Sequence, residues 1–236
     1  MSETPGELAA RSEIERRVEA TTRVVLRPIA SPAALGFIGL AAATLTLAGL
    51  QLGWMEKAEG EKVALIALAF TVPLQLLASI FGFLARDGVI ATGMGTLAGI
   101  WFAIAVVLLS SQPGQTSDAL GLFLIGAGAA MWIPALTASM SKLVPALVLG
   151  TAGLRFMLGG LHNLTSNEGW EHAAGIVGLI LFAFALYAAL AAELEDAQKR
   201  TVLPFGRRGK GKLAVEGSLL DQVRQVESEP GVRQQL

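Results

Sequence analysis

The residue with the clearest chemical meaning in this sequence is Arg155, which lies inside the apolar stretch LVPALVLGTAGLRFMLGGL. Counted back from Leu161, it lies six residues inside that stretch, or about 9 Å at helical rise. A guanidinium at this depth in a membrane is costly unless it faces a cavity, a partner or the headgroup region. Two interpretations stay open. Arg155 attracts an anion such as a carboxylate in an aqueous vestibule, or its long side chain extends to the outer headgroups.

Uncharged polar residues inside other apolar stretches are the remaining candidates for a substrate path. Any one of them is more often bonded to its own helix or to a neighbouring helix. Together they could line a narrow, mostly apolar path with few hydrogen-bonding groups, which suits a small solute. These candidates are Thr44, Thr46, Gln75, Ser79, Thr92, Thr96 and Thr151.

Patterns for catalysis or metal binding are absent from the sequence. It contains no G-x-S-x-G, H-E-x-x-H or G-x-x-x-x-G-K motif and no cysteine, so we expect neither an enzyme nor a metal or cofactor site. The two histidines, His162 and His172, flank a loop without the helical spacing of a metal-ligand pair, and we interpret them as polar loop groups. No Asp or Glu lies well inside an apolar segment. A proton-coupled carrier usually keeps a titratable group there.

The elements that must position these residues are apolar enough to cross a membrane. The chain has 236 residues and is 16% charged, whereas soluble domains carry about 25% charged residues. A spanning helix needs roughly 20 apolar residues. Six segments approach or exceed that length, at about residues 33–53, 63–84, 89–109, 119–138, 143–161 and 173–194. The sequence therefore predicts an all-α integral membrane protein built as a bundle of six transmembrane helices.

The charges between these segments predict the orientation. Near the spans, thirteen Lys and Arg residues lie on the side that holds both termini, and two lie on the opposite side. The positive-inside rule then places the N and C termini in the cytoplasm, which requires an even number of spans. The net charge of −1 gives no reason to expect a nucleic-acid partner.

We divide the chain into three parts. Residues 1–30 form a cytoplasmic polar segment, interpreted either as an amphipathic helix on the membrane surface or as a partly ordered tail. Residues 31–206 form the membrane domain, whose many glycines predict close helix packing. Residues 207–236 form a cytoplasmic tail. The basic cluster where this tail begins either attracts anionic lipid or serves only as a topology signal.

Three motifs in this six-span frame resemble those of the acetate uptake transporter family, which includes bacterial succinate–acetate permeases. The first is Ser31-Pro32-Ala33-Ala34-Leu35-Gly36, similar to the family's N-P-A-P-L-G at the start of span 1. The second is Arg86-Asp87-Gly88, followed by Ala91-Thr92-Gly93 and Trp101. The third lies beyond Tyr187 and comprises Thr201, Val202, Leu203, Pro204, Phe205 and Gly206. Together they cover residues 31–206.

The resemblance implies a six-helix protomer with its own substrate path, assembled as a homohexamer in the plasma membrane. It also implies transport of small monocarboxylates, chiefly acetate, with the dicarboxylate succinate as a second candidate, coupled to or accompanied by protons. The residues on matching positions of the family are Thr44, Gln75, Thr92, Trp101 and Asn163. The excess of Arg over Lys indicates a bacterial source, and hence the cytoplasmic membrane.

Besides Ser31 and Ala34 in the first motif, three further positions depart from the family pattern. Leu40 and Leu97 replace family aromatics near the path, and Gly82 replaces an acidic residue. These changes would alter the constriction and remove a carboxylate. They leave open a second hypothesis, a non-transporting membrane scaffold or partner-binding protein that keeps the fold.

Overall fold

The computed structural model describes residues 13, 16, 30–198, 200–209 and 212. Within this part of the chain, six helices are long and apolar enough to cross a membrane. Span 2 is one continuous helix, Lys57–Leu84, built from η1 (Lys57–Glu59), α3 (Gly60–Ile66), the π-helix η2 (Ala67–Thr71) and α4 (Val72–Leu84). The others are α2 (Ala33–Gln51), α5 (Gly88–Ser110), α6 (Asp118–Ser139), α7 (Leu143–Thr165) and α8 (Glu168–Gln198). The prediction of an all-α, six-span bundle is confirmed.

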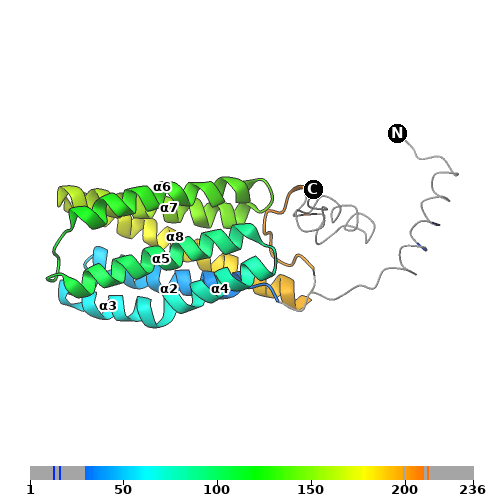
Figure 1. Ribbon diagram of the computed structural model, residues 1–236, viewed down its shortest axis with the longest axis horizontal. Coiled ribbons are helices and arrows are strands. Elements are labelled where there is room, and N and C mark those ends of the chain that lie inside the picture. Colours follow the sequence, from blue (N-terminus) through cyan, green and yellow to red (C-terminus); the bar gives the residue numbers. More distant parts are fainter. Residues whose placement is uncertain (1–12, 14–15, 17–29, 199, 210–211, 213–236) are drawn as a thin grey trace, which may run out of the picture.

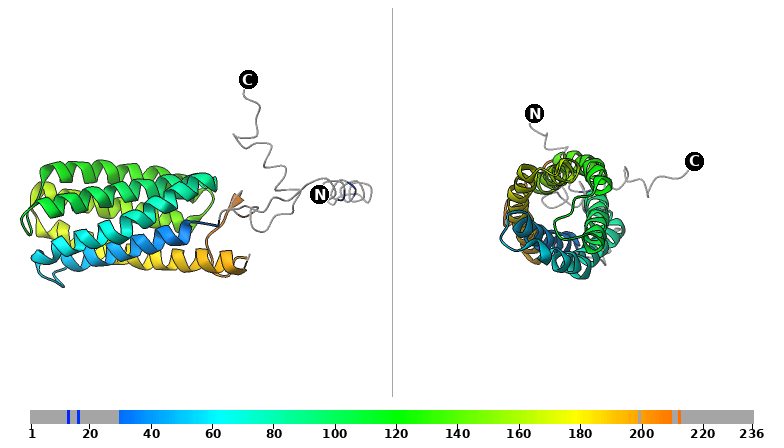
Figure 2. Two further views of the ribbon diagram at one scale, coloured as in Figure 1. Left: turned by 60° about the horizontal axis from the view of Figure 1, so that its bottom comes forward. Right: turned by 90° about the vertical axis from the view of Figure 1, so that its left-hand side faces the viewer.

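Successive spans run antiparallel along the long axis of the bundle, and seen end-on they form a ring (Figures 1 and 2). We call the end that holds Ala33 and Gln198 the proximal end and the opposite end the distal end. The loop charges predict that the proximal end faces the cytoplasm, and this orientation stays a prediction. Most of residues 1–30 and of residues 207–236 lies outside the described residues, so the interpretations of these two segments also stay predictions.

Spans 2, 5 and 6 are longer than the apolar segments predicted them to be, and in span 5 the helix α7 continues to Thr165 rather than ending near residue 161. Span 2 begins at Lys57 and span 6 runs from Glu168 to Gln198, because the polar turns flanking their apolar stretches are helical as well. Span 2 also contains Pro73, which lacks an N–H and crowds the carbonyl four residues before it. The π-helix Ala67–Thr71 ends two residues before this proline. Such π-segments accommodate a break in the regular hydrogen-bond ladder.

Helix α2 is the most buried span. In its most apolar 18-residue stretch 72% is buried, against 39–50% in the corresponding stretches of the other spans. Its small residues permit this position. A Cβ atom on Gly36 would lie 2.6 Å from Met94 Sδ, and a Cβ atom on Gly39 would lie 3.2 Å from Leu74 Cβ. Because helices in a membrane associate through close backbone contact, these glycines let α4 and α5 approach α2.

Helices α6 and α7 pack through two reciprocal glycine pairs. A Cβ atom on either Gly128 or Gly153 would lie 2.7 Å from the carbonyl oxygen of the other. Gly121 and Gly160 repeat this arrangement one level further along, at 3.0 and 2.7 Å. The two backbones are therefore in direct contact at these glycines. A larger residue there would meet a backbone carbonyl, which cannot move aside as a side chain can.

The segment after α8 caps the start of α7. The first N–H groups of a helix have no partner within it. Leu143 N donates to Gly206 O at 3.0 Å, and Val144 N donates to Phe205 O at 3.3 Å. The Phe205 side chain is buried, and Arg207 Nε donates to Glu195 Oε2 at 2.9 Å. The third family-like motif therefore has a structural role: it binds the first turn of α7 at the proximal end. We call residues 201–206 the closing segment.

Candidate functional site

A cavity of about 180 Å³ extends inward from the distal end of the bundle. We call it the distal vestibule. Its outer wall is formed by residues 111–115 and by the start of span 2, and its inner wall by apolar residues of α2, α5 and α6. A water molecule occupies about 30 Å³ in the liquid. The vestibule therefore has room for a small solute or a few water molecules.

Arg155 lies at the inner end of the vestibule. Its side chain is 2% exposed and is turned into the bundle, so it does not extend to the outer surface as the headgroup interpretation requires. Its Nη2 donates to Gln51 Oε1 at 3.2 Å. The guanidinium carbon lies 5.3 Å from the ring centroid of Trp101 and 5.9 Å from that of Phe156. These distances allow cation–π attraction to both rings.

Several buried polar atoms near Arg155 and deeper in the bundle have no hydrogen-bond partner among the described residues. Buried polar groups are normally paired, because leaving one unpaired costs about 1–3 kcal/mol. The atoms come from four different helices and include three of the predicted path residues. They are Thr44 Oγ1, Gln75 Nε2 and Oε1, Trp101 Nε1 and Arg155 Nε.

One face of α2 connects these groups. Leu40, Thr44 and Gln51 follow one another at spacings of four and seven residues, which places them on the same side of a helix. Gln51 and Leu47 line the vestibule, whereas Leu40 and Thr44 are fully buried. Gln75 packs against this helix beside Gly39, whose ideal Cβ position lies 3.6 Å from Gln75 Cγ. The polar groups therefore continue from the vestibule toward the proximal end.

The remaining predicted path residues do not belong to this group of unpaired atoms. Asn163 lines the vestibule, where its Oδ1 accepts from Ser117 N at 3.0 Å. Thr92 is exposed on the surface of the chain, and its hydroxyl donates to Gly88 O at 2.7 Å. Leu97 is fully buried in the core. The structure thus groups Thr44, Gln75 and Arg155 in the interior and separates Thr92 from them.

Gly82, which falls where the family carries an acidic residue, faces the backbone of α5. A Cβ atom there would lie 2.9 Å from Ala91 N. In this chain the position brings α4 and α5 into direct contact and leaves no room for a carboxylate.

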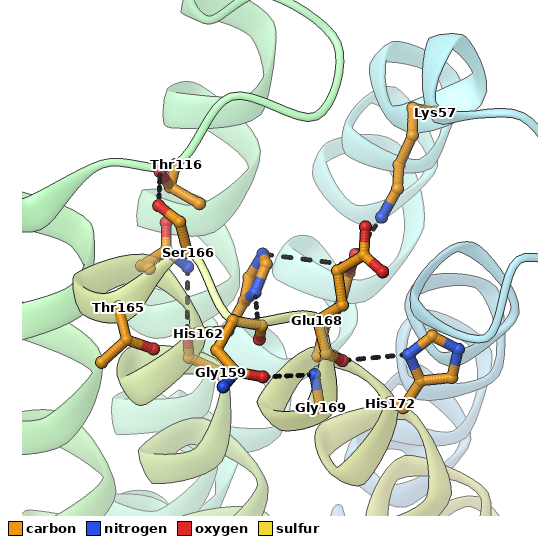
Figure 3. A network of polar contacts seen from close by, with 12 residues as sticks. Lys57, Thr116, Gly159, His162, Thr165, Ser166, Glu168, Gly169 and His172 are labelled. Carbon is orange, nitrogen blue, oxygen red and sulfur yellow. Dashed lines mark hydrogen bonds and ion pairs between the residues drawn. The ribbon is translucent and has the colours of Figure 1, made fainter.

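Charged side chains cross the mouth of the vestibule (Figure 3). Lys57 at the start of span 2 forms an ion pair with Glu171 of α8. His162 Nε2 lies 4.0 Å from Glu171 Oε2, and its Nδ1 lies 3.1 Å from Asn167 O. His162 therefore belongs to the vestibule wall, although its sequence position indicated only a loop group. His172 is exposed, and its Nδ1 lies 2.9 Å from Glu168 O.

Sequence reasoning missed the residues that hold Arg155 in place. Gln51 could have been found, because it follows Thr44 by seven residues on the same face of span 1. For Gly178, no spacing in the sequence indicated a contact with Arg155. A Cβ atom there would lie 2.8 Å from Arg155 Nε and 3.0 Å from Ala48 Cβ, so only glycine leaves the guanidinium its present position.

Comparison with known proteins agrees with this architecture. Residues 16–205 match the model of the GPR1/FUN34/yaaH family. The chain is 27% identical over 183 residues to the succinate-acetate/proton symporter SatP of Escherichia coli (strain K12), covering 75% of this chain and 96% of the relative. The SatP proteins of Escherichia coli O157:H7 and Shigella flexneri match to the same extent. The solved structure of the bacterial acetate channel SatP has the same fold, with a TM-score of 0.68 at 23% identity over 75% of this chain and 99% of that chain.

Proposed function

The chain belongs to the GPR1/FUN34/yaaH family, as its motifs predicted, and from this premise we propose that it moves small monocarboxylates through each protomer. Its family and relatives are transporters and channels rather than enzymes, so it is a multi-pass membrane transport protein. Within the proposal, acetate is the preferred substrate and succinate a poorer one. Arg155, the one buried Lys or Arg among the described residues, offers strong pairing to one carboxylate only.

The observation that carries this proposal is the run of unpaired polar atoms that continues inward from the vestibule. Thr44, Gln75 and Trp101 present hydrogen-bonding atoms that no described residue satisfies. A passing carboxylate and its water would satisfy them in turn. Leu40, which is fully buried on the same face of α2 as Thr44, supplies apolar contact for the short alkyl group of the substrate. Groups of this kind, few and polar within an apolar wall, are typical of sites for small molecules.

Proton movement is part of the proposal because the three SatP relatives are named as proton symporters. Among the described residues, the buried polar groups other than Glu171 at the vestibule mouth include no carboxyl or imidazole. A proton could therefore accompany the substrate on the substrate's own carboxyl group. We also propose a homohexamer in the bacterial cytoplasmic membrane with the proximal end inside. Native mass spectrometry of the purified protein tests the subunit number.

Uptake into liposomes tests the transport proposal. Full-length protein is reconstituted, and labelled acetate and succinate are supplied with and without a pH gradient. We expect acetate uptake well above that of empty liposomes, and faster uptake when the outside is acidic. Leu47→Trp, which fills the vestibule wall, is expected to reduce acetate uptake at least tenfold. Ile38→Trp on the same helix is the matched control, because Ile38 is 44% exposed on the outer surface.

Two results would count against this proposal. Equal uptake by the Leu47→Trp and Ile38→Trp variants would exclude a path through the vestibule. Correctly folded protein that moves neither acetate nor succinate at any pH would favour the scaffold hypothesis.

A further inference from the structure

We propose that Arg155 forms a standing binding site for a small anion at the inner end of the vestibule, and that its ligand is the deprotonated form of a short straight-chain monocarboxylate. The identity of the ligand rests on the proposed function. The existence of an anion site rests on the surroundings of Arg155 alone.

The first observation is that the charge of Arg155 is buried without a counter-charge. The residue is 2% exposed, and its one hydrogen bond to a described side chain is to the neutral amide of Gln51. Two carboxylates line the outer vestibule, Glu61 and Glu171, and neither forms an ion pair with Arg155. Glu171 is instead paired with Lys57. A buried charge normally has a paired or hydrogen-bonded partner, so an anion from solution is the missing partner.

The second observation is that the guanidinium of Arg155 lies against the Trp101 ring, and the unpaired atoms of these two side chains are both donors. Arg155 Nε and Trp101 Nε1 are buried without an acceptor, and their side chains lie against each other. Neither a guanidinium nor an indole nitrogen can accept a hydrogen bond. A ligand that satisfies both must therefore bring acceptors. A carboxylate brings two acceptor oxygens together with the negative charge that the guanidinium lacks.

The third observation is that the guanidinium is held ready for a ligand. The rings of Trp101 and Phe156 meet edge to face, with centroids 5.8 Å apart, and both lie against Arg155. Gln51 fixes Nη2 from the opposite helix, and Gly178 leaves room for Nε. Because these contacts already fix the side chain, Arg155 loses little conformational entropy when an anion binds.

The vestibule wall beside this site selects the ligand. Leu47, Ile104 and Leu124 line the cavity near Arg155 and are each less than a tenth exposed. A short alkyl chain fits such a wall, whereas a second carboxylate would be buried there without a partner. The preferred ligand is therefore acetate or propionate rather than a dicarboxylate.

Titration of the full-length protein in nanodiscs tests this site. Sodium acetate is added at constant ionic strength, and binding is followed by calorimetry and by the fluorescence of Trp101 against a Trp101→Phe blank. We expect saturable acetate binding and none with acetamide, which is similar in shape but uncharged.

Two substitutions of Arg155 test its role. Arg155→Gln is expected to weaken acetate binding at least tenfold, and Arg155→Lys is expected to weaken it less. Lys62→Gln is the matched control, because it removes the same charge from the distal end, where Lys62 bonds only Glu59 at the surface.

Measuring acetate affinity at two pH values tests the charge state without any variant. If the anion binds, the affinity per total acetate stays constant from pH 6 to pH 8. If the neutral acid binds, the affinity falls about tenfold per pH unit, because the protonated fraction does so above the carboxyl pKa. Such a fall would overturn the proposal, as would wild-type binding by the Arg155→Gln variant with an unchanged Tm.

The two proposals fail separately. Acetate binding that depends on Arg155 without flux in liposomes would overturn the proposed function and support the anion site. Acetate flux and binding that are both unchanged by Arg155→Gln and Arg155→Lys would overturn the anion site and leave the proposed function standing.

Discussion

Replacing Gly128 with leucine is expected to destabilise the folded bundle strongly or to prevent its formation, whereas replacing Gly126 with leucine should leave it intact. A Cβ atom on Gly128 would lie 2.7 Å from Gly153 O and 2.7 Å from Met157 Cγ. No such neighbour lies within 4 Å of a Cβ atom on Gly126, two residues away on the same helix. The contact at Gly128 is with backbone, so α6 and α7, which lie side by side in Figure 1, would have to separate.

The size of this effect follows from packing. Excess volume in a well-packed core costs about 1–3 kcal/mol when side chains can adjust. Here a carbonyl oxygen must move, so we expect a loss at or above the top of that range. For a protein of this length, such a loss lowers the Tm by roughly 6–12 °C or removes the folded state. Size-exclusion chromatography and thermal unfolding of both variants provide the measurement. Similar behaviour of the two leucine variants would refute the role of the Gly128–Gly153 contact.

The second large effect is expected at Gly206, where valine should detach the closing segment from α7. Gly206 has φ +66°, and a Cβ atom would lie 2.5 Å from Leu143 Cβ. Moving the segment breaks the hydrogen bonds from Leu143 N and Val144 N and exposes Phe205. Two hydrogen bonds at about 1 kcal/mol each and one buried phenylalanine at about 1.5–3 kcal/mol set the scale of the loss.

Gly209 provides the matched control for Gly206. It also has positive φ, +48°, but the nearest atom to its Cβ position is Met140 O at 3.9 Å. A side chain in the left-handed region costs about 1–2 kcal/mol at either position. The Gly206→Val variant should therefore unfold about 10 °C below the Gly209→Val variant. Faster proteolysis between α8 and the closing segment should accompany this change. Equal Tm values for the two variants would show that only backbone strain matters at these positions.

The apolar segments were sufficient to predict the fold class. Crossing a membrane is a local requirement, because each helix must satisfy its own backbone and reach about 20 apolar residues. All six spans were therefore visible in the sequence, and polar turns such as those at Lys57, Thr165 and Glu168 extended some of them. The family membership was visible as well, because residues 31–36 and 201–206 lie at fixed places relative to the spans.

The direction of each side chain was not visible, because it depends on which helices become neighbours. Thr44 and Thr92 both lie in apolar spans, yet Thr44 is fully buried on central α2 and Thr92 is exposed on α5. Arg155 had two interpretations in the sequence. Its position in the interior depends on Gln51, 104 residues earlier in the chain, and on Trp101 and Gly178 from two further helices.

The sequence by itself therefore determined that the chain is a six-span membrane protein of this family, since hydropathy and motif position are properties of contiguous residues. Only the tertiary structure decided that Arg155, the charge within the apolar part of α7, faces a vestibule rather than the lipid headgroups. The physical reason is that the free energy of a buried guanidinium is set by partners distant in sequence, and four helices must assemble before those partners exist.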